Sequence, residues 1–381
     1  MDLGFTEEQL SLKTSVINFA TRELNSDLIR RDKSSAFSRD AWLKCAKFGI
    51  QGFPIPKEFG GSGADIVTTT LLMEGLGYGC RDNGLVFSLN AQLWSLEMPL
   101  VEFGSIEQKK RYLPGLVSGE LIGVHAMTEA DSGSDAFSLR TKAERHGNRY
   151  MINGSKLYIT NAPVADVLIV FATVQPGSGF AGTTAFLIEK GTKGFSVSRE
   201  FDKMGLRTSP MGEITLSECE VPEENRLGKE GTGMAIFNSS MEWERSCILA
   251  NAVGVMQRQL EGCVTYARNR RQFGQPIGKF QSISNKIADM YLRLEAARML
   301  VYKVAWLKQQ GKSASAEAAA AKVFTSEAWV KSSLDAIQIH GAFGYMTDSE
   351  VERDLRDSIA GTIYSGTSEI QRLIIARSLG L

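Results

Sequence analysis

The sequence predicts an α+β fold in which a β-sheet region lies between two helical regions. Helical periodicity dominates roughly the first 120 residues, and short β-rich segments separated by glycines follow up to Gly228. From Gly233 the chain has no proline before Pro276, which leaves room for one or two extended helices. We therefore expect an N-terminal helical domain at residues 1–120, a central antiparallel β-sheet domain at 121–230 and a C-terminal helical domain at 231–381.

Two capping boxes mark helix starts in the N-terminal region. Thr6 is followed three positions later by Gln9, and Ser105 stands in the same relation to Gln108. In this motif each side chain bonds the backbone N–H of the other residue, which satisfies two donors at the start of a helix. The first box predicts a helix to about residue 25, and the second predicts a helix that ends near Pro114.

The middle and C-terminal regions differ in their periodicity. β-rich runs begin at four positions: Val167, Thr184, Phe195 and Glu213. A glycine-rich break at 177–182 separates two of these runs. Further on, apolar residues at helical spacing predict the core-facing side of a long helix: Ile287, Met290, Leu294, Ala297, Val301 and Val304. An alanine-rich helix is expected next, from Ala314 to about Ile339.

Composition excludes several classes of function. Lysine plus arginine and aspartate plus glutamate each total 43, so charge gives no reason to expect nucleic acid as a partner. No apolar run approaches membrane-spanning length, and the N-terminus is acidic where a secretory signal would be basic. The odd number of scattered cysteines, five, predicts reduced thiols in a cytoplasmic protein. The three histidines show no ligand spacing, so we expect no metal site.

One stretch near the middle of the chain has the composition of a ligand-binding segment. Residues 127–135 are dense in small residues and short hydroxyls, and Gly133 can take backbone angles closed to other residues. Downstream, Tyr158 and Thr160 are two positions apart, so in a regular strand they point to the same face. An aromatic plate beside hydroxyl groups suits a flat heteroaromatic ring with polar edges. Taken alone, a Ser/Gly/Asp loop is more often a surface turn.

Motifs spread over nearly the whole chain match one family in register: Phe59-Gly-Gly-Ser-Gly, Phe103-Gly-Ser, Tyr112-Leu-Pro, Met127-Thr-Glu through Asp135, Lys203-Met-Gly-Leu-Arg-Thr-Ser, Arg270-Arg-Gln-Phe-Gly, Gln338-Ile-His-Gly-Ala-Phe-Gly-Tyr and Tyr364-Ser-Gly-Thr-Ser-Glu-Ile-Gln-Arg. In these motifs the chain resembles the acyl-CoA dehydrogenase family. The resemblance implies the helix–sheet–helix fold of that family with a C-terminal four-helix bundle, FAD as the cofactor, and an acyl thioester as the substrate.

The resemblance also assigns residues to the cofactor. Six of them serve the flavin ring, its phosphates or the thioester tail: Met127, Thr128, Gly133, Ser134, Tyr158 and Thr160. Tyr158 would lie against the ring, where the family more often has Trp. Thr367 and Glu369 match flavin-contacting positions near the C-terminus. Five more residues match positions that receive the adenine and pyrophosphate of a neighbouring subunit's FAD: Arg270, Phe273, Gln281, Gln338 and Gly341. Such a site needs two chains, so we expect a homotetramer built from dimers.

The catalytic base is the feature in which this sequence departs most from the common pattern of the family. In this family a carboxylate removes the α-proton of the thioester, and many members carry it as Glu in a C-terminal Tyr-Glu-Gly-Thr motif. Here that position is Ser365, whose hydroxyl is far too weak a base. A minority of members supply the carboxylate from the long helix after the sheet, directly before an Arg, and Glu244-Arg245 matches that position. Helical geometry alone does not exclude Glu242.

The resemblance gives the other groups of the site their roles. The backbone N–H of Ser365 would polarise the thioester carbonyl, and Arg245 and Tyr364 would contact the substrate. A base on this helix occurs in isovaleryl- and long-chain-type enzymes, and in enzymes that oxidise a prolyl group on a carrier protein in natural-product pathways. The general character of this chain favours the last group. The alternatives are a short- or branched-chain acyl-CoA dehydrogenase, an oxidase or monooxygenase, and a flavin-holding relative without turnover. The electron acceptor is expected to be oxygen or an electron-transfer flavoprotein.

Overall fold

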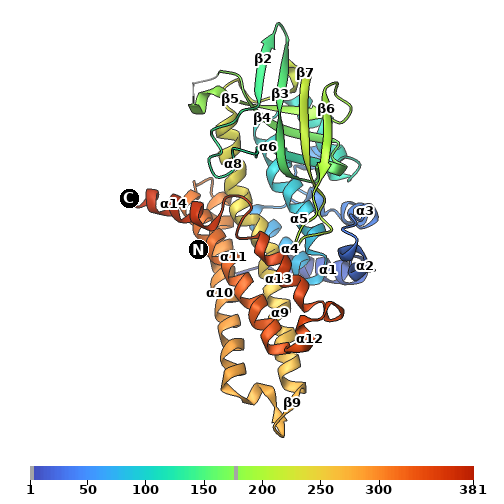
Figure 1. Ribbon diagram of the computed structural model, residues 1–381, viewed down its shortest axis with the longest axis vertical. Helices are drawn as coiled ribbons and strands as arrows, with labels where there is room; N and C mark the ends of the chain where they lie inside the picture. Colours follow the sequence, from blue (N-terminus) through green and yellow to red (C-terminus); the bar gives the residue numbers. More distant parts are fainter. Residues whose placement is uncertain (1–3, 176–178) are drawn as a thin grey trace.

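The computed structural model describes residues 4–175 and 179–381. The first residues of the acidic N-terminus and the start of the 177–182 break lie outside these ranges. The sheet lies at one end of the molecule, and the long helices α9 (Ala250–Asn269) and α10 (Gln281–Gln309) extend to the other end (Figure 1). Among the described residues we find no helix whose length and apolar character would let it span a bilayer.

The N-terminal region is helical, as expected. Its helices are α1 (Glu7–Glu23), α2 (Leu28–Lys33), α3 (Arg39–Phe48), α4 (Ile66–Gly79), α5 (Asn83–Gln92), α6 (Met98–Phe103) and α7 (Ile106–Val117). Both predicted capping boxes form, at Thr6 and at Ser105. However, α7 does not end near Pro114 but continues to Val117. Pro114 cannot donate a helical hydrogen bond, but the buried side chains of Leu116 and Val117 keep the last turn packed in the core.

The central region folds into a sheet of mostly antiparallel strands. Its strands are β1 (Gly123–Ala126), β2 (Lys142–His146), β3 (Arg149–Thr160), β4 (Val167–Thr173), β5 (Thr183–Glu189), β6 (Phe195–Glu200), β7 (Met211–Pro222) and β8 (Arg226–Leu227). They are ordered β6-β7-β3-β2-β4-β5-β8. Both β1 and β2 pair with β4 in parallel, which the sequence did not indicate. Alternate residues of β4 enter two separate cores, so this strand is buried on both faces.

The C-terminal region is a helical bundle. It contains α8 (Gly233–Ser246), α9, the short β9 (Arg271–Gln272) and β10 (Gln275–Pro276), α10, α11 (Ser315–His340), α12 (Ala342–Tyr345), α13 (Val351–Ala360) and α14 (Ser368–Ser378). A 3₁₀ turn at Cys247–Leu249 separates α8 from α9, so the segment without proline forms two helices. Helix α11 packs against α8, α9, α10, α13 and α14 and is therefore central to the bundle.

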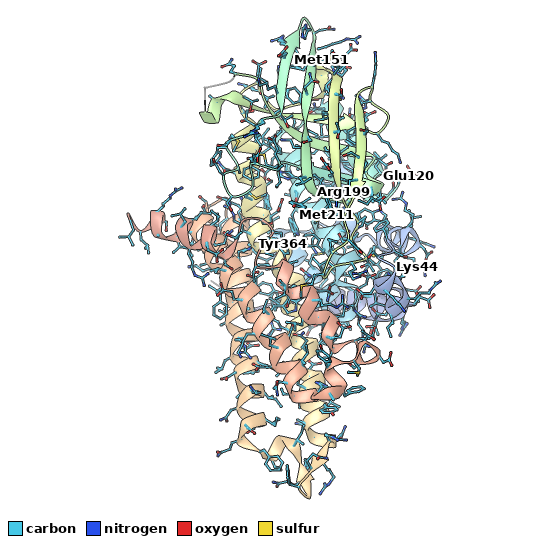
Figure 2. The ribbon with its side chains drawn as sticks, viewed as in Figure 1. Lys44, Glu120, Met151, Arg199, Met211 and Tyr364 are labelled. Atoms are coloured by element: carbon cyan, nitrogen blue, oxygen red, sulfur yellow. The ribbon has the colours of Figure 1, made fainter. Side chains whose placement is uncertain are left out.

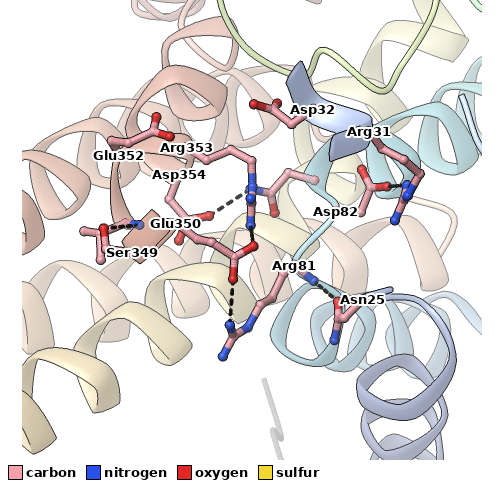
Figure 3. Close-up of polar contacts among 12 residues, drawn as sticks. Asn25, Arg31, Asp32, Arg81, Asp82, Ser349, Glu350, Glu352, Arg353 and Asp354 are labelled. Atoms are coloured by element: carbon pink, nitrogen blue, oxygen red, sulfur yellow. Dashed lines mark hydrogen bonds and ion pairs between the residues drawn. The ribbon is translucent and has the colours of Figure 1, made fainter. Parts of the chain in front are cut away.

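A network of charged side chains fixes α13 against the N-terminal region. Glu350, just before α13, lies between Arg81 and Arg353 (Figure 3), and its carboxylate oxygens are 3.0 Å and 2.9 Å from these two guanidinium groups. Nearby, Arg31 pairs with Asp82 at the start of α5. Arg81 is exposed, but Arg353, Arg31 and Asp82 are largely buried, so breaking one of their pairs would leave an uncompensated charge. The pair of Glu350 with Arg81 thereby joins the start of α13 to the segment between α4 and α5.

Candidate active site

The candidate active site is built around a carboxylate on α8. Glu244 is 9% exposed, and its Oε2 accepts a hydrogen bond of 2.5 Å from Ser365 Oγ. Glu242 is two positions earlier, which on a helix is a rotation of about 200°. Its carboxylate accepts from Lys308 Nζ at 2.9 Å instead. The structure therefore brings Glu244, and not Glu242, to the turn that carries Ser365.

That turn, between α13 and α14, is held by three side chains from three helices. Ser365 and Gly366 both have positive φ angles, 54° and 89°. Lys322 of α11 donates to the Gly366 carbonyl at 2.7 Å, and Gln371 of α14 donates to both carbonyls at 3.0 Å and 2.8 Å. Arg245 of α8 donates to the Ser365 carbonyl at 3.4 Å. With its carbonyls fixed in this way, the turn presents the Ser365 N–H, which has no acceptor among the residues that the structure describes.

The charged groups around this turn are strongly desolvated. Burial lowers the pKa of Lys322 to about 8; Arg245 lowers it further, whereas Glu327 and Glu369 act against the shift. Burial also lowers the pKa of Arg245, and the charge of Glu244 opposes that change. Each of these groups therefore has a large electrostatic effect on its neighbours, because little water screens them.

Several partly exposed residues near Glu244 belong to otherwise buried elements. On α5, Phe87 and Ala91 keep some exposure while the residues around them are buried, and the Phe87 ring packs 4.8 Å from that of Tyr364. Burial raises the pKa of Tyr364, and the carboxylate of Glu244 raises it further. His125 on β1 is likewise half-buried, and its ring lies 5.9 Å from that of Phe237 on α8. Glu244 thus has aromatic neighbours, because its charge acts on both Tyr364 and His125.

A buried ion pair that the sequence did not reveal holds the segment 127–129 against the sheet. Lys156 of β3 is fully buried and donates to the Met127 carbonyl at 3.1 Å and to Glu129 at 2.7 Å. Leu157 N–H donates to the Thr128 carbonyl at 2.8 Å. Burial lowers the pKa of Lys156 to about 8, and Glu129 opposes the shift. Glu129 is part of the motif at residues 127–135, but the sequence did not show that it pairs with Lys156, which lies on β3.

The residues assigned to the flavin edge lie at the end of β3, with a geometry that differs from the expected strand. Tyr158 is 58% exposed with φ of 58°, and the β3–β7 pairing is irregular between Lys156 and Ile159. The extra residue falls between Lys156 and Ile159, so Tyr158 lies in a bulge and not in the regular strand that the alternation argument assumed. Tyr158 and Thr160 are nevertheless both more exposed than the buried Ile159 between them. Thr160 pairs with Met211, which Figure 2 shows at the end of the sheet nearest the helices. The half-buried Thr160 and the accessible ring of Tyr158 still fit a flat heteroaromatic ligand with polar edges.

The loop after Thr128 is open to solvent. Gly133 and Ser134 are exposed, and a Cβ added at Gly133 would meet no described atom within 4 Å. Gly133 also lacks the positive φ that would require glycine, so the conformational argument for this residue is wrong. The loop is anchored instead by Ser132, whose hydroxyl donates to the Asp135 carbonyl at 2.7 Å.

The other assigned residues fall into two groups. Thr367 caps α14 beside the Ser365 turn, and Glu369 is exposed in the first turn of that helix. The five residues assigned to the neighbouring FAD are at the far end of the bundle, around β9, the start of α10 and the end of α11 (Figure 1): Arg270, Phe273, Gln281, Gln338 and Gly341. Within one chain they do not meet Glu244. All five residues are exposed, and Phe273 is 94% exposed.

Family models match the three regions in turn. The N-terminal, middle and C-terminal domains of acyl-CoA dehydrogenase match residues 6–120, 125–219 and 231–380. An L-prolyl-[peptidyl-carrier protein] dehydrogenase of Serratia sp. is 43% identical over 381 residues, which is 100% of this chain and 99% of the relative.

Solved structures are similar over the same length. The prolyl acyl carrier protein oxidase AnaB is 53% identical with a TM-score of 0.98, covering 99% of this chain and 100% of that one. PigA with FAD and proline is 43% identical with a TM-score of 0.97, covering 100% of both chains. The chain therefore belongs to the acyl-CoA dehydrogenase family.

Proposed function

We propose that this protein is an FAD-dependent dehydrogenase that oxidises an acyl thioester between its α- and β-carbons, with a prolyl group on a carrier protein as the substrate. The relatives named for prolyl carrier-protein oxidation match it from end to end, and one was solved with FAD and proline. The observation that carries the proposal is the buried Glu244 carboxylate held by Ser365 at 2.5 Å. It supplies the base that the C-terminal motif lacks.

Glu244 acts on the α-carbon. Its carboxylate accepts the α-proton while the bond from the β-carbon to hydrogen breaks, and an α,β-double bond forms. Bound FAD supplies the acceptor for the hydride, and so for the two electrons. The Ser365 hydroxyl keeps Glu244 in one orientation, and the closed environment keeps water away from the carboxylate.

The turn after α13 stabilises the negative charge that develops on the thioester oxygen. The unpaired N–H of Ser365 is the donor for that oxygen, and the positive charges of Arg245 and Lys322 lie behind the same turn. Tyr364 packs beside Phe87, and its ring contacts the acyl group of the substrate. Because the turn is already fixed by its carbonyls, little rearrangement accompanies the reaction.

The cofactor would be held by two chains. Met127, Thr128, Tyr158 and Thr160 would hold the ring of one FAD, and Gly133 and Ser134 would lie toward its phosphates or the thioester arm. Thr367 and Glu369 would complete the ring site. Arg270, Phe273, Gln281, Gln338 and Gly341 of a partner chain would receive the adenine and pyrophosphate, with Arg270 as the charge-assisted donor. We propose a homotetramer on this basis, with domain boundaries near residues 120 and 230 and a cytoplasmic location.

Anaerobic reduction of the flavin tests the proposal. Purified holoenzyme is mixed with a prolyl-carrier protein or with isovaleryl-CoA, and the visible flavin absorbance is followed. We expect bleaching by the prolyl-carrier protein only. Bleaching by isovaleryl-CoA alone would identify a branched-chain acyl-CoA dehydrogenase, and no bleaching by any acyl thioester would indicate a flavin-holding relative. Peroxide release under air distinguishes oxygen from an electron-transfer flavoprotein as the acceptor.

A further inference from the structure

The kind of acyl group that this site accepts can be inferred from the position of the Ser365 side chain, which lies next to Glu244. A base that removes an α-proton lies against the α-carbon. In an aminoacyl thioester the nitrogen is bonded to that same carbon, so a group next to the base is within reach of the nitrogen. Ser365 Oγ, 2.5 Å from Glu244 Oε2, is such a group.

The hydroxyl of Ser365 has unused hydrogen-bonding capacity of one kind only. A serine hydroxyl has one hydrogen to donate and two lone pairs that accept. The hydrogen goes to Glu244, and in the described part of the chain no donor bonds to Ser365 Oγ. The open positions are therefore acceptors. The ring nitrogen of a prolyl group carries N–H in its neutral and its protonated form, whereas an aliphatic acyl group has no donor to offer.

The acceptor is fixed in place before any substrate arrives. Lys322, Gln371 and Arg245 hold the two carbonyls of the turn, so the Cα of Ser365 cannot shift to relieve an unpaired lone pair. A site built to bond a polar substrate group rejects the analogue that lacks it more strongly than an apolar pocket rejects a missing methylene. A rigid, half-buried acceptor beside the base thus discriminates between acyl groups.

We propose that Ser365, through its side-chain oxygen, is a specificity-determining residue that recognises the α-nitrogen of an aminoacyl thioester. This inference rests on the proposed function, because it places the α-carbon at Glu244. The inference also explains why Ser365 stands where many family members have glutamate. The smaller serine side chain leaves space for the substrate nitrogen, and its oxygen accepts a hydrogen bond from that nitrogen.

The test compares two acyl groups of the same ring size on the same carrier protein, prolyl and cyclopentanecarbonyl, in which carbon replaces nitrogen. Single-turnover flavin reduction is measured anaerobically with both, for wild-type holoenzyme, Ser365→Ala, Ser365→Gly and Ser246→Ala. Ser246 is the matched control, because its hydroxyl lies on α8 and donates to the Glu242 carbonyl at 2.8 Å, away from the turn. The readout is the ratio of the two rates, because losing the contact with Glu244 slows both substrates alike.

We expect the prolyl to cyclopentanecarbonyl ratio to fall about tenfold in Ser365→Ala, the loss typical of one hydrogen bond to a polar group, and to stay unchanged in Ser246→Ala. Ser365→Gly suits the positive φ and should show the same fall if the alanine variant loses flavin. An unchanged ratio in both flavin-loaded Ser365 variants would overturn the inference. If wild-type flavin is not reduced by the prolyl thioester at all, the proposed function itself fails, which is a separate result.

Discussion

Glu242 and Glu244 show that the partner of a helix side chain depends on what the helix packs against. The apolar pattern around them is compatible with either as the inward residue, so the periodicity of the sequence left both open. The structure separates them, because α8 turns one toward Lys308 and the other toward Ser365. The family pattern pointed to Glu244, but the contact with the Ser365 side chain required the C-terminal turn to be placed in space.

Replacing Lys156 by Met tests the buried pair at the residue scale. Met fills a similar volume but leaves the Glu129 carboxylate without its cation, so the free energy of unfolding should fall by about 3–5 kcal/mol. Urea denaturation of the holoenzyme measures the change. Lys142→Met on neighbouring β2 is the control, because that side chain is exposed and its loss should cost little. Equal stability of the two variants would mean that the pair does not hold segment 127–129.

At the scale of elements, the turn between α13 and α14 is predicted to depend on Lys322. Lys322→Met removes the donor to the Gly366 carbonyl and a positive charge behind the Ser365 N–H. We expect the rate constant for flavin reduction by the prolyl thioester to fall about tenfold or more at full flavin occupancy. Lys331→Met on the same helix, whose side chain is 59% exposed, should react as the wild type does. Wild-type rates in Lys322→Met would contradict this role of the lysine.

The π-helical turn at Leu93–Glu97, which follows α5, carries a carboxyl group with a predictable effect on stability. Burial raises the pKa of Glu97 from its ordinary 4.5 to about 8, although Gln92 lowers it. The folded chain then holds a proton that the unfolded chain releases. The resulting stabilisation is complete below pH 4.5 and is lost as the pH rises through about 8.

Glu97→Gln should remove this pH dependence. Between pH 6 and 8 the unfolding free energy of the wild type should fall relative to that of the variant, by up to about 1.4 kcal/mol per pH unit. Urea denaturation at several pH values measures the slope. Exposed Glu120→Gln should keep the wild-type slope. A slope identical in wild type and Glu97→Gln would show that Glu97 titrates as an exposed carboxyl does.

Elements defined by local signals were predictable from the sequence, and those defined by distant partners were not. The capping boxes at Thr6 and Ser105 start helices where the motif predicts, because both bonding partners are four residues or fewer apart. The parallel pairing of β1 with β4 and the bulge at Tyr158 depend on strands tens of residues away. The extension of α7 past Pro114 depends on the core that Leu116 and Val117 enter.

At the scale of the whole molecule, the two groups of residues that we propose to bind the cofactor lie far apart in space within one chain. The Glu244 site adjoins the sheet, and the β9–β10 hairpin with Arg270 and Phe273 lies at the far end of the bundle (Figure 1). The exposure of Phe273, 94%, is unusual for a large aromatic residue and fits a site completed by another chain.

Complementation between two inactive variants tests the two-chain site. Glu244→Gln lacks the base, and Arg270→Ala lacks the phosphate donor that a neighbour is proposed to need. A mixed oligomer contains sites in which Glu244 comes from one chain and Arg270 from the other, so co-expressed, differently tagged variants should regain activity that neither has alone. Activity is measured on doubly purified mixed oligomers. If these remain as inactive as the parents, each FAD site is made by one chain.

The central claim, that Glu244 is the base, is tested most directly by single-turnover flavin reduction. Wild type, Glu244→Gln and Glu242→Gln, each loaded with FAD, are mixed anaerobically with the prolyl-carrier protein in a stopped-flow instrument. The rate constant should fall about 10²–10⁴-fold in Glu244→Gln, the contribution of a positioned general base, while Glu242→Gln stays close to wild type. A Glu244→Gln variant that reduces its flavin at the wild-type rate, or an equal loss in Glu242→Gln, would contradict it.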